Sequence, residues 1–385
     1  MSLKPMKTLA VLAAAALSLT ACGSNTTPGE TVEPAPPADT LPAETMPVEP
    51  TDAGETTSTD DASAPAEEPT DAGSEPAAGE IDPGPMKTVE LEQKDTYTIG
   101  YSQANNAEPY RAQLNIQLEY FVGEQDNLEL LPIADAAQDS SRQVSQVQQF
   151  ITQGVDILIV SPNESDPLTP PVQQACDAGI PVIVLDRTVN TDCIAAFIGG
   201  DNVAIGRAAG ELALELLPDG GTVVELRGIL SNQPQIDRDQ GFRDAIAENP
   251  DIEIVKDQEA KWVKEEGTKV MQQWLQSGEQ IDLVYAHNDP MALGAYLAAA
   301  AAGQEGDIAF IGIDGLAIPD GGIRAVEQGQ LDGTFIYPTG AKEAVDTVMK
   351  MIAGEEFGSN QTLPTEAVTK DNAAEVYERY DFSNR

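Results

Sequence analysis

The chain has 385 residues, enough for one or two domains, and its formal net charge at pH 7 is −43, from 64 acidic and 21 basic residues. Such a chain is repelled by nucleic acid and by anionic membrane surfaces, so we expect neither as a partner. The sequence has no Gly-rich Walker run, no Gly-x-Ser-x-Gly element and a single His. It therefore predicts neither ATP hydrolysis nor a serine hydrolase, and we expect no cofactor and no metal site.

The N-terminal residues have the features of an export signal. Lys4 and Lys7 precede an apolar run over 9–19, and Leu19-Thr20-Ala21-Cys22 follows. A short positive region, a short apolar core and small residues are typical of a secretory signal, here residues 1–21, and not of a membrane span.

The Cys in the fourth position of that run resembles a bacterial lipobox, in which the chain is cut before the Cys and the Cys receives acyl chains such as palmitate. The resemblance implies an extracytoplasmic protein anchored to the cell membrane through Cys22. The alternative is a plain signal peptide with an incidental Cys.

Residues 22–90 are rich in Pro, Ala, Thr, Glu and Asp and almost free of large apolar side chains, and the fragment at 51–54 recurs at 70–73. Such a segment cannot bury enough apolar surface to offset its ordering entropy. We therefore expect a disordered, extended acidic tether between Cys22 and a folded region that begins near residue 95.

From residue 95 on, short β-rich runs alternate with helical patterns. We predict strands at 96–101, 128–133, 156–160, 181–185, 222–226, 252–255, 281–285, 308–311 and 333–336, with helices between most of them. This alternation indicates α/β structure with parallel sheets that are covered on both faces. About ten strands are more than one compact sheet usually holds, so we expect two doubly wound lobes.

Polar and aromatic side chains follow the predicted strands, and in such sheets ligands bind beyond the carboxyl ends of the strands. Asp and Asn accept hydrogen bonds from hydroxyls, Arg and Asn donate to them, and an aromatic face covers C–H groups. The set therefore suits a neutral polyol. It consists of Tyr110, Arg111, Asp186, Arg187, Arg238, Trp262, Asn288 and Asp314.

Several of these motifs resemble the periplasmic binding proteins for pentoses and hexoses of ABC transporters, the ribose-type, two-lobed type I fold. The similar segments are Asp186-Arg187, 286–294 and 311–315. Two further pairs look closest to the galactofuranose-binding branch: 100–103 with Tyr110-Arg111, and 224–228 with 236–238. The likeness covers about residues 95–365.

The resemblance implies an N-terminal lobe of residues 95–201 plus 338–365, a C-terminal lobe of 202–337 plus 366–385, and a hinge of three crossings. It implies capture of a monosaccharide, a pentose or hexose such as galactofuranose, by a monomer that is not an enzyme. The permease would consist of separate chains. The eight residues above match the family's sugar ligands, although Tyr110 stands where the galactofuranose branch usually has Trp. The chain also departs from the family at the strand end 336–338, where ribose binders carry a Gln.

Other interpretations stay open. A sugar-sensing receptor of the same fold, an extracellular carbohydrate-active enzyme, or a binder of another small molecule would share much of this sequence. Asn288 could only cap a helix, and His287 and Trp274 are expected to be structural. Cys176 and Cys193 could form a disulfide or stay free, because spacing alone does not place their Cβ atoms.

Overall fold

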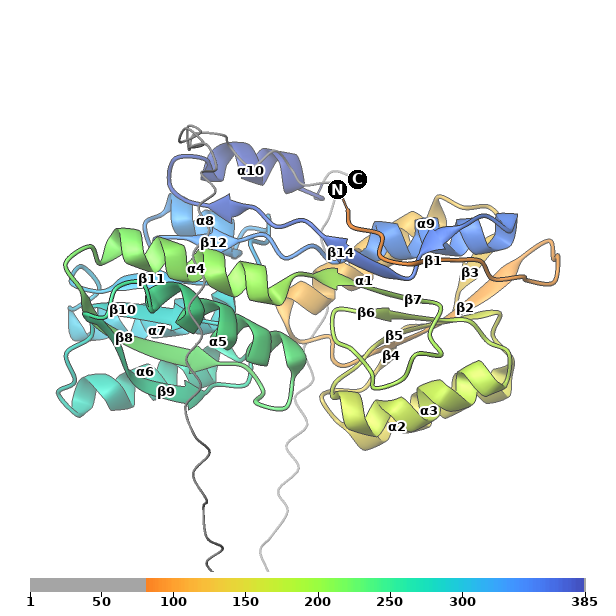
Figure 1. The fold of residues 1–385 in the computed structure, drawn as a ribbon, viewed down its shortest axis with the longest axis horizontal. Helices are drawn as coiled ribbons and strands as arrows, with labels where there is room; N and C mark the ends of the chain where they lie inside the picture. The colour runs from red at the N-terminus through yellow and green to blue at the C-terminus, as the bar shows by residue number, and fades with distance from the viewer. Residues whose placement is uncertain (1–80, 384–385) are drawn as a thin grey trace, which may run out of the picture. The chain divides into compact units, whose positions relative to one another are not determined.

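The structure is a computed structural model that describes residues 81–383 (Figure 1). Its first sheet, in the N-terminal lobe, is entirely parallel, with strand order β14-β7-β6-β5-β2-β3 and β4 paired to β2. The central strands are continuously apolar and buried, as expected for a sheet with two covered faces. The strands are β2 (Tyr97–Gln103), β3 (Leu128–Leu130), β4 (Ala134–Asp135), β5 (Ile157–Ser161), β6 (Val182–Leu185), β7 (Ala196–Gly200) and β14 (Asn360–Leu363).

Helices cover both faces of this sheet. α1 (Pro109–Gly123) and α9 (Ala341–Ala353) pack together on one face, and α2 (Ser140–Gln153) and α3 (Ser165–Asp177) on the other (Figure 1). Strand residues of opposite parity enter the two cores, as the alternation of side chains along a strand requires.

The second sheet, in the C-terminal lobe, is also parallel, with order β11-β10-β8-β9. Its strands are β8 (Gly221–Arg227), β9 (Ile252–Glu259), β10 (Leu283–Ala286) and β11 (Ala309–Ile311). α4 (Asn202–Leu216) packs with α5 (Gln233–Ile246) on one face, and α6 (Lys264–Gln276) with α7 (Asp289–Ala302) on the other. These two sheets confirm the predicted α/β class.

The C-terminal third of the chain runs between the two sheets more than once. β12 (Thr334–Phe335) pairs antiparallel with β15 (Ala367–Val368), and α10 (Ala373–Tyr380) packs on α8 (Gly322–Glu327). Between these elements of the C-terminal lobe, the chain supplies α9 and β14 to the N-terminal lobe.

The expected end of the tether at residue 90 is wrong. β1 (Met86–Lys87) pairs antiparallel with β13 (Phe357–Gly358), and Asp82 forms a bridge with Thr362. Val89 packs against the core of the N-terminal lobe. Backbone pairing of this kind needs no apolar periodicity, so the composition of the segment does not reveal it.

Two further local findings concern the N-terminal lobe. The strand expected at 128–133 ends at Leu130, and Pro132, which has no N–H to donate, follows before β4 begins. Cys176 on α3 and Cys193 are joined by a disulfide with 6.1 Å between their Cα atoms.

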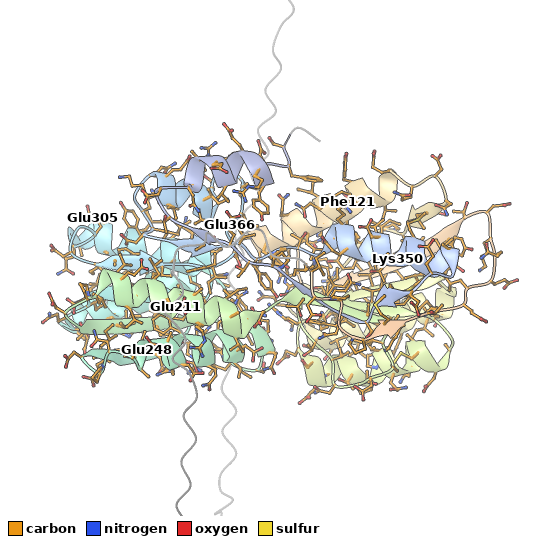
Figure 2. The ribbon with its side chains drawn as sticks, turned by 45° about the horizontal axis from the view of Figure 1, so that its top comes forward. Phe121, Glu211, Glu248, Glu305, Lys350 and Glu366 are labelled. Atoms are coloured by element: carbon orange, nitrogen blue, oxygen red, sulfur yellow. A yellow bond between two sulfur atoms is a disulfide. The ribbon has the colours of Figure 1, made fainter. Side chains whose placement is uncertain are left out.

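The acidic charge lies largely on solvated surfaces. Figure 2 labels Glu211, Glu248 and Glu305, all exposed on the C-terminal lobe. Within residues 81–383 no helix is long and apolar enough to cross a membrane.

Candidate functional site

All eight residues singled out in the sequence line one cavity, to which both lobes contribute. Its volume is about 30 Å³, and its walls include Tyr110, Arg111, Asp186, Arg187, Arg238, Trp262, Asn288 and Asp314. Each of these side chains is at most 7% exposed. The cavity lies where the carboxyl ends of the strands meet, the place at which α/β sheets bind ligands.

In the N-terminal lobe, Arg111 and Asp186 form a buried ion pair. Nη2 of Arg111 donates to Oδ2 of Asp186 at 2.7 Å, and Nη1 donates to Gln103 Oε1 and Ser161 Oγ at 2.6 Å each. A guanidinium anchored at one end and paired at the other is held in one orientation. It therefore fixes the carboxylate of Asp186 at the cavity wall.

Arg187 adds a second guanidinium from the same turn. Its Nη1 donates to the carbonyl of Asn163 at 2.9 Å, and its Nε lies 3.7 Å from Oδ2 of Asp186. Burial, together with the nearby charge of Arg111, lowers the pKa of Arg187 to about 10. The side chain still carries its charge at neutral pH, so it remains a hydrogen-bond donor.

Arg238 enters from α5 of the C-terminal lobe. Its Nε donates to Asn202 Oδ1 at 2.8 Å, and its Nη1 donates to the carbonyl of His287 at 2.6 Å. The guanidinium also lies over the rings of Tyr337 and Trp262, with its Cζ atom 4.6 Å and 5.6 Å from the ring centroids. Arg238 is thus a fixed part of the wall and not a solvated helix residue.

Trp262 presents a flat apolar face to the cavity although it is only 5% exposed. Its Nε1 donates to Asn232 Oδ1 at 3.1 Å. Gly228 makes room for the indole, since a Cβ atom there would lie 2.1 Å from Cζ2 of Trp262. The backbone of Trp262 is left-handed, with a φ of 68°.

Asn288 and Asp314 differ in whether their side-chain polar atoms already have hydrogen-bond partners within the protein. Oδ1 of Asn288 accepts from the backbone N–H of Met291 at 3.0 Å and so caps α7, while its Nδ2 donates to the carbonyl of Trp262 at 3.1 Å. No residue within 81–383 donates a hydrogen bond to the carboxyl of Asp314. Burial, and then the neighbouring carboxyl of Asp289, raise the pKa of Asp314 well above its usual range.

Tyr337 is a cavity residue that the sequence reasoning treated only as a departure from the family. Its ring centroid lies 5.2 Å from that of Tyr110, whose hydroxyl donates to the carbonyl of Pro338 at 3.2 Å. Since Tyr337 directly follows the predicted strand at 333–336, the rule about strand ends could have found it. Glu108, also in the wall, was missed; its carboxylate lies 3.5 Å from Nε of Arg111.

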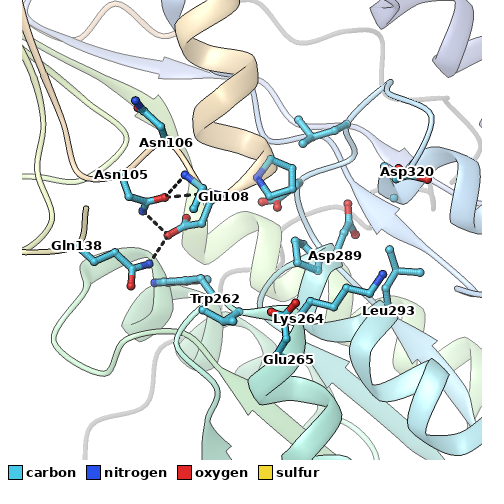
Figure 3. Close-up of a pocket in the computed structure, with 18 of the residues that line it drawn as sticks. Asn105, Asn106, Glu108, Gln138, Trp262, Lys264, Glu265, Asp289, Leu293 and Asp320 are labelled. Carbon is cyan, nitrogen blue, oxygen red and sulfur yellow. Dashed lines mark hydrogen bonds between the residues drawn. The ribbon is translucent and has the colours of Figure 1, made fainter. Parts of the chain in front are cut away.

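A wider cavity of about 530 Å³ adjoins the narrow one and shares Glu108, Pro109, Trp262, Pro290 and Asp314 with it. Figure 3 shows Glu108 accepting hydrogen bonds from Asn105 and Gln138, with nitrogen–oxygen distances of 2.7 and 3.1 Å. The wider cavity therefore brings polar amides and carboxylates next to the narrow cavity.

Left-handed backbone is concentrated at these two cavities. The six non-glycine residues with positive φ among those described are Ala137, Gln138, Asp186, Lys261, Trp262 and Asp314. Five of them line one or both cavities, and Lys261 precedes Trp262. Each such conformation costs on the order of 1–3 kcal/mol and persists where the surrounding structure fixes it.

His287 lies behind the cavity wall. Its Nε2 is 2.8 Å from Glu225 Oε1, and both residues are fully buried. Burial and the charge of Arg238 lower the pKa of His287 well below its usual range, so the ring is neutral. This supports the structural role expected for it. No cluster that could hold a metal ion occurs within residues 81–383.

Comparisons with known proteins agree with this geometry. Residues 99–356 match the family described as periplasmic binding protein domain. A protein of Rhizobium meliloti named for rhizopine binding is 36% identical over 286 residues, which is 72% of this chain and 92% of that protein. The galactofuranose-binding protein of Escherichia coli (strain K12) is 32% identical over 277 residues, covering 69% of this chain and 84% of its own length.

Among solved structures, the fructose binding periplasmic domain of a hybrid two component system superposes with a TM-score of 0.71 and 35% identity. The match covers 74% of this chain and 94% of that domain. Proteins named for different ligands thus match at similar identity, which does not single out the galactofuranose branch. With two parallel-sheet lobes, a cavity lined by both and these matches, the chain belongs to the type I periplasmic binding proteins, an extracytoplasmic family of solute-binding proteins.

Proposed function

We propose that this protein captures an uncharged monosaccharide, a pentose or hexose, outside the cytoplasm and delivers it to an ABC permease made of other chains. The observation that carries the proposal is that all eight residues selected for polyol chemistry line one buried cavity. The residues come from several strand ends in two lobes, so a chance cluster on one loop would not produce this set.

The cavity offers what a polyol needs. Three guanidinium groups, those of Arg111, Arg187 and Arg238, donate hydrogen bonds, while Asp186 and Asp314 accept them. The aromatic rings of Tyr110, Trp262 and Tyr337 supply flat faces for the C–H side of a sugar ring. Because positive and negative groups are both present, a neutral ligand with many hydroxyls fits better than an ion.

Capture would follow closure of the two lobes about the three chain crossings near residues 201, 338 and 365. The sugar binds one lobe first and then contacts the second, so it stabilises the closed form by contacts that the open form lacks. A sugar that lacks one hydroxyl leaves buried polar groups unpaired and binds less tightly.

We propose binding without chemical change, by a monomer. The carboxylate of Asp186 is already engaged by Nη2 of Arg111 at 2.7 Å, an arrangement that suits holding a ligand hydroxyl better than the paired free carboxyl groups of a glycosidase.

We also propose that the protein is a lipoprotein held to the membrane through Cys22. This residue and the signal at 1–21 lie outside the described residues, so the proposal depends on the lipobox-like sequence. The acidic stretch up to about residue 80 would then act as a tether.

The direct test is a thermal-shift screen of the full chain with pentoses and hexoses, furanose forms included. A ligand that binds only the folded state raises the melting temperature with concentration. Asp186→Asn keeps an oxygen for Arg111 and should lose most of the shift, while Asp126→Asn, on an exposed turn, should keep it. No shift with any sugar, or equal shifts in both variants, would refute the proposal.

A sugar-sensing receptor is the second candidate, favoured by the match to a sugar-binding domain of a two component system. Deleting the gene separates the two functions. Loss of labelled-sugar uptake supports import, whereas unchanged uptake with a lost transcriptional response supports sensing.

A further inference from the structure

A chain of hydrogen bonds crosses from one lobe to the other beside the cavity. The carbonyl of Asn163, which follows β5 in the N-terminal lobe, accepts from Nη1 of Arg187 at 2.9 Å and from Nδ2 of Asn232 at 3.0 Å. Asn232 belongs to the C-terminal lobe, directly before α5. Asn163 is 4% exposed and Asn232 is 2% exposed, so water does not compete for this bond.

The same Asn232 side chain continues the connection into the cavity wall. Its Oδ1 accepts from Nε1 of Trp262 at 3.1 Å, and the carbonyl of Trp262 accepts from Nδ2 of Asn288 at 3.1 Å. Arg187, Trp262 and Asn288 line the narrow cavity, but Asn163 and Asn232 line neither cavity. Asn163 and Asn232 therefore hydrogen-bond to residues of the cavity wall without lining the cavity themselves.

Local helix chemistry does not explain Asn232. It occupies the N-cap position of α5, where an Asn side chain usually accepts from the first helical N–H groups. Here the side chain makes no capping hydrogen bond and turns to Asn163 and Trp262 instead. A cap of this kind stabilises a helix by about 1 kcal/mol, so its absence marks a position where another role has prevailed.

We propose that Asn232 is a positioning residue that couples lobe closure to the orientation of the Trp262 indole. We name Asn163, Asn232 and Trp262 the cross-lobe latch. When the lobes meet, Asn232 binds the Asn163 carbonyl and holds the indole against the cavity at the same time. Opening breaks the bond to Asn163 and leaves the indole held by one lobe alone. The latch builds on the proposed sugar capture and assigns it a residue outside the ligand shell.

A neighbouring pair provides a useful contrast. Ser231 donates to Oε1 of Glu164 at 2.9 Å, also across the lobes, but this bond is exposed. Exposed polar contacts exchange readily with water and contribute little. Ser231→Ala should therefore change ligand binding less than twofold, although it lies one residue from the latch.

The test uses the full chain with Trp274→Phe, which leaves Trp262 as the sole tryptophan, since the sequence has two. Asn232→Asp keeps an acceptor for the indole but faces the Asn163 carbonyl with a carboxylate in place of a donor. Without sugar, we expect acrylamide to quench Trp262 at least about twofold more strongly in Asn232→Asp than in the Trp274→Phe parent. The reason is that the variant populates the closed form less. Gln233→Ala, whose side chain bonds Asp237 within α5, is the matched control and should match the parent.

The second measurement is stopped-flow fluorescence with D-ribose, D-galactose, D-fructose and myo-inositol. Losing the latch should speed dissociation about tenfold and leave association within about twofold, as expected for a bond that forms after encounter. Asn232→Ser, which removes both bonds of the side chain, should speed dissociation at least as much. A merely structural role would lower the melting temperature and leave the ratio of these rates unchanged.

Unaltered quenching and unaltered dissociation in Asn232→Asp, with a folded protein, would overturn the latch. If Asn232→Asp fails to fold, Asn232→Ser gives the same two outcomes. If none of the four compounds binds, the proposed function fails for these ligands, while the quenching comparison still decides for or against the latch.

Discussion

Replacing Asp314 with Asn is the sharpest single test of the cavity. The two side chains have nearly the same shape, so the change is one of charge and of hydrogen-bonding capacity. Asp314 is 5% exposed and receives no side-chain hydrogen bond within residues 81–383. The variant should therefore remove a costly buried group without breaking an existing contact.

The expected effect on stability follows from the raised pKa of Asp314. A carboxyl whose pKa is higher in the folded state contributes stability that is fully present below its unfolded pKa of about 4. That stability is lost as the pH rises through the folded pKa. Asp314→Asn escapes the loss, so without sugar the variant should be at least as stable as the parent at about pH 7.

The expected effect on binding has the opposite sign. An ionised carboxylate that accepts from a sugar hydroxyl makes a stronger hydrogen bond than a neutral amide by about 1–2 kcal/mol. Asp314→Asn should therefore weaken Kd about 5- to 30-fold. Because the sugar favours the ionised form, the parent should release protons on binding and lose affinity as the pH falls through the raised pKa of Asp314, and the variant should do neither.

Isothermal titration calorimetry with the tightest sugar from the screen, in two buffers of different ionisation enthalpy, measures Kd and proton release together. Asp126→Asn serves as the exposed control. Equal Kd values for the parent and Asp314→Asn, with no proton release by the parent, would show that Asp314 does not contact the cargo.

Three further predictions follow from other parts of the chain. Replacing both Cys176 and Cys193 with Ser opens a loop with a sequence separation of 17, which should cost about 3 kcal/mol and lower the calorimetric Tm by about 5 °C; an unchanged Tm would count against the bridge. Gly228→Ala should displace the Trp262 indole and weaken sugar binding in a titration at least about tenfold, while Gly306→Ala, whose Cβ would meet open space, should have no effect. Cys22→Ser should move the protein from the membrane fraction to the soluble fraction on an immunoblot, and persistent membrane association would rule out the lipid anchor.

The sequence predicted most of what depends on strands. Buried apolar runs such as Ile157–Ser161 have a strong pattern, and in parallel sheets their carboxyl ends gather at one edge. For this reason Asp186, Asn288 and Asp314, far apart in the chain, could be placed together from the sequence alone.

What the sequence did not predict depends on single side chains and on backbone pairing. Asn232 has the expected N-cap residue type, and only its contacts show that its amide is used elsewhere. The resemblance marked the strand end 336–338 only as a departure from ribose binders, so it did not select Tyr337. β1 consists of Met86–Lys87 in a polar segment, and a strand of two residues has no periodicity to detect.

The pairing of β1 with β13 has a mechanical consequence. Any force applied through the preceding eighty residues enters the fold through the N-terminal lobe, at the edge made by Phe357–Gly358. If the preceding residues tether the protein as proposed, the N-terminal lobe is the anchored one, and the C-terminal lobe, which carries Arg238 and Trp262, can rotate about the proposed hinge without moving the attachment point. Binding and release of the ligand would thus not depend on the tension in the proposed tether.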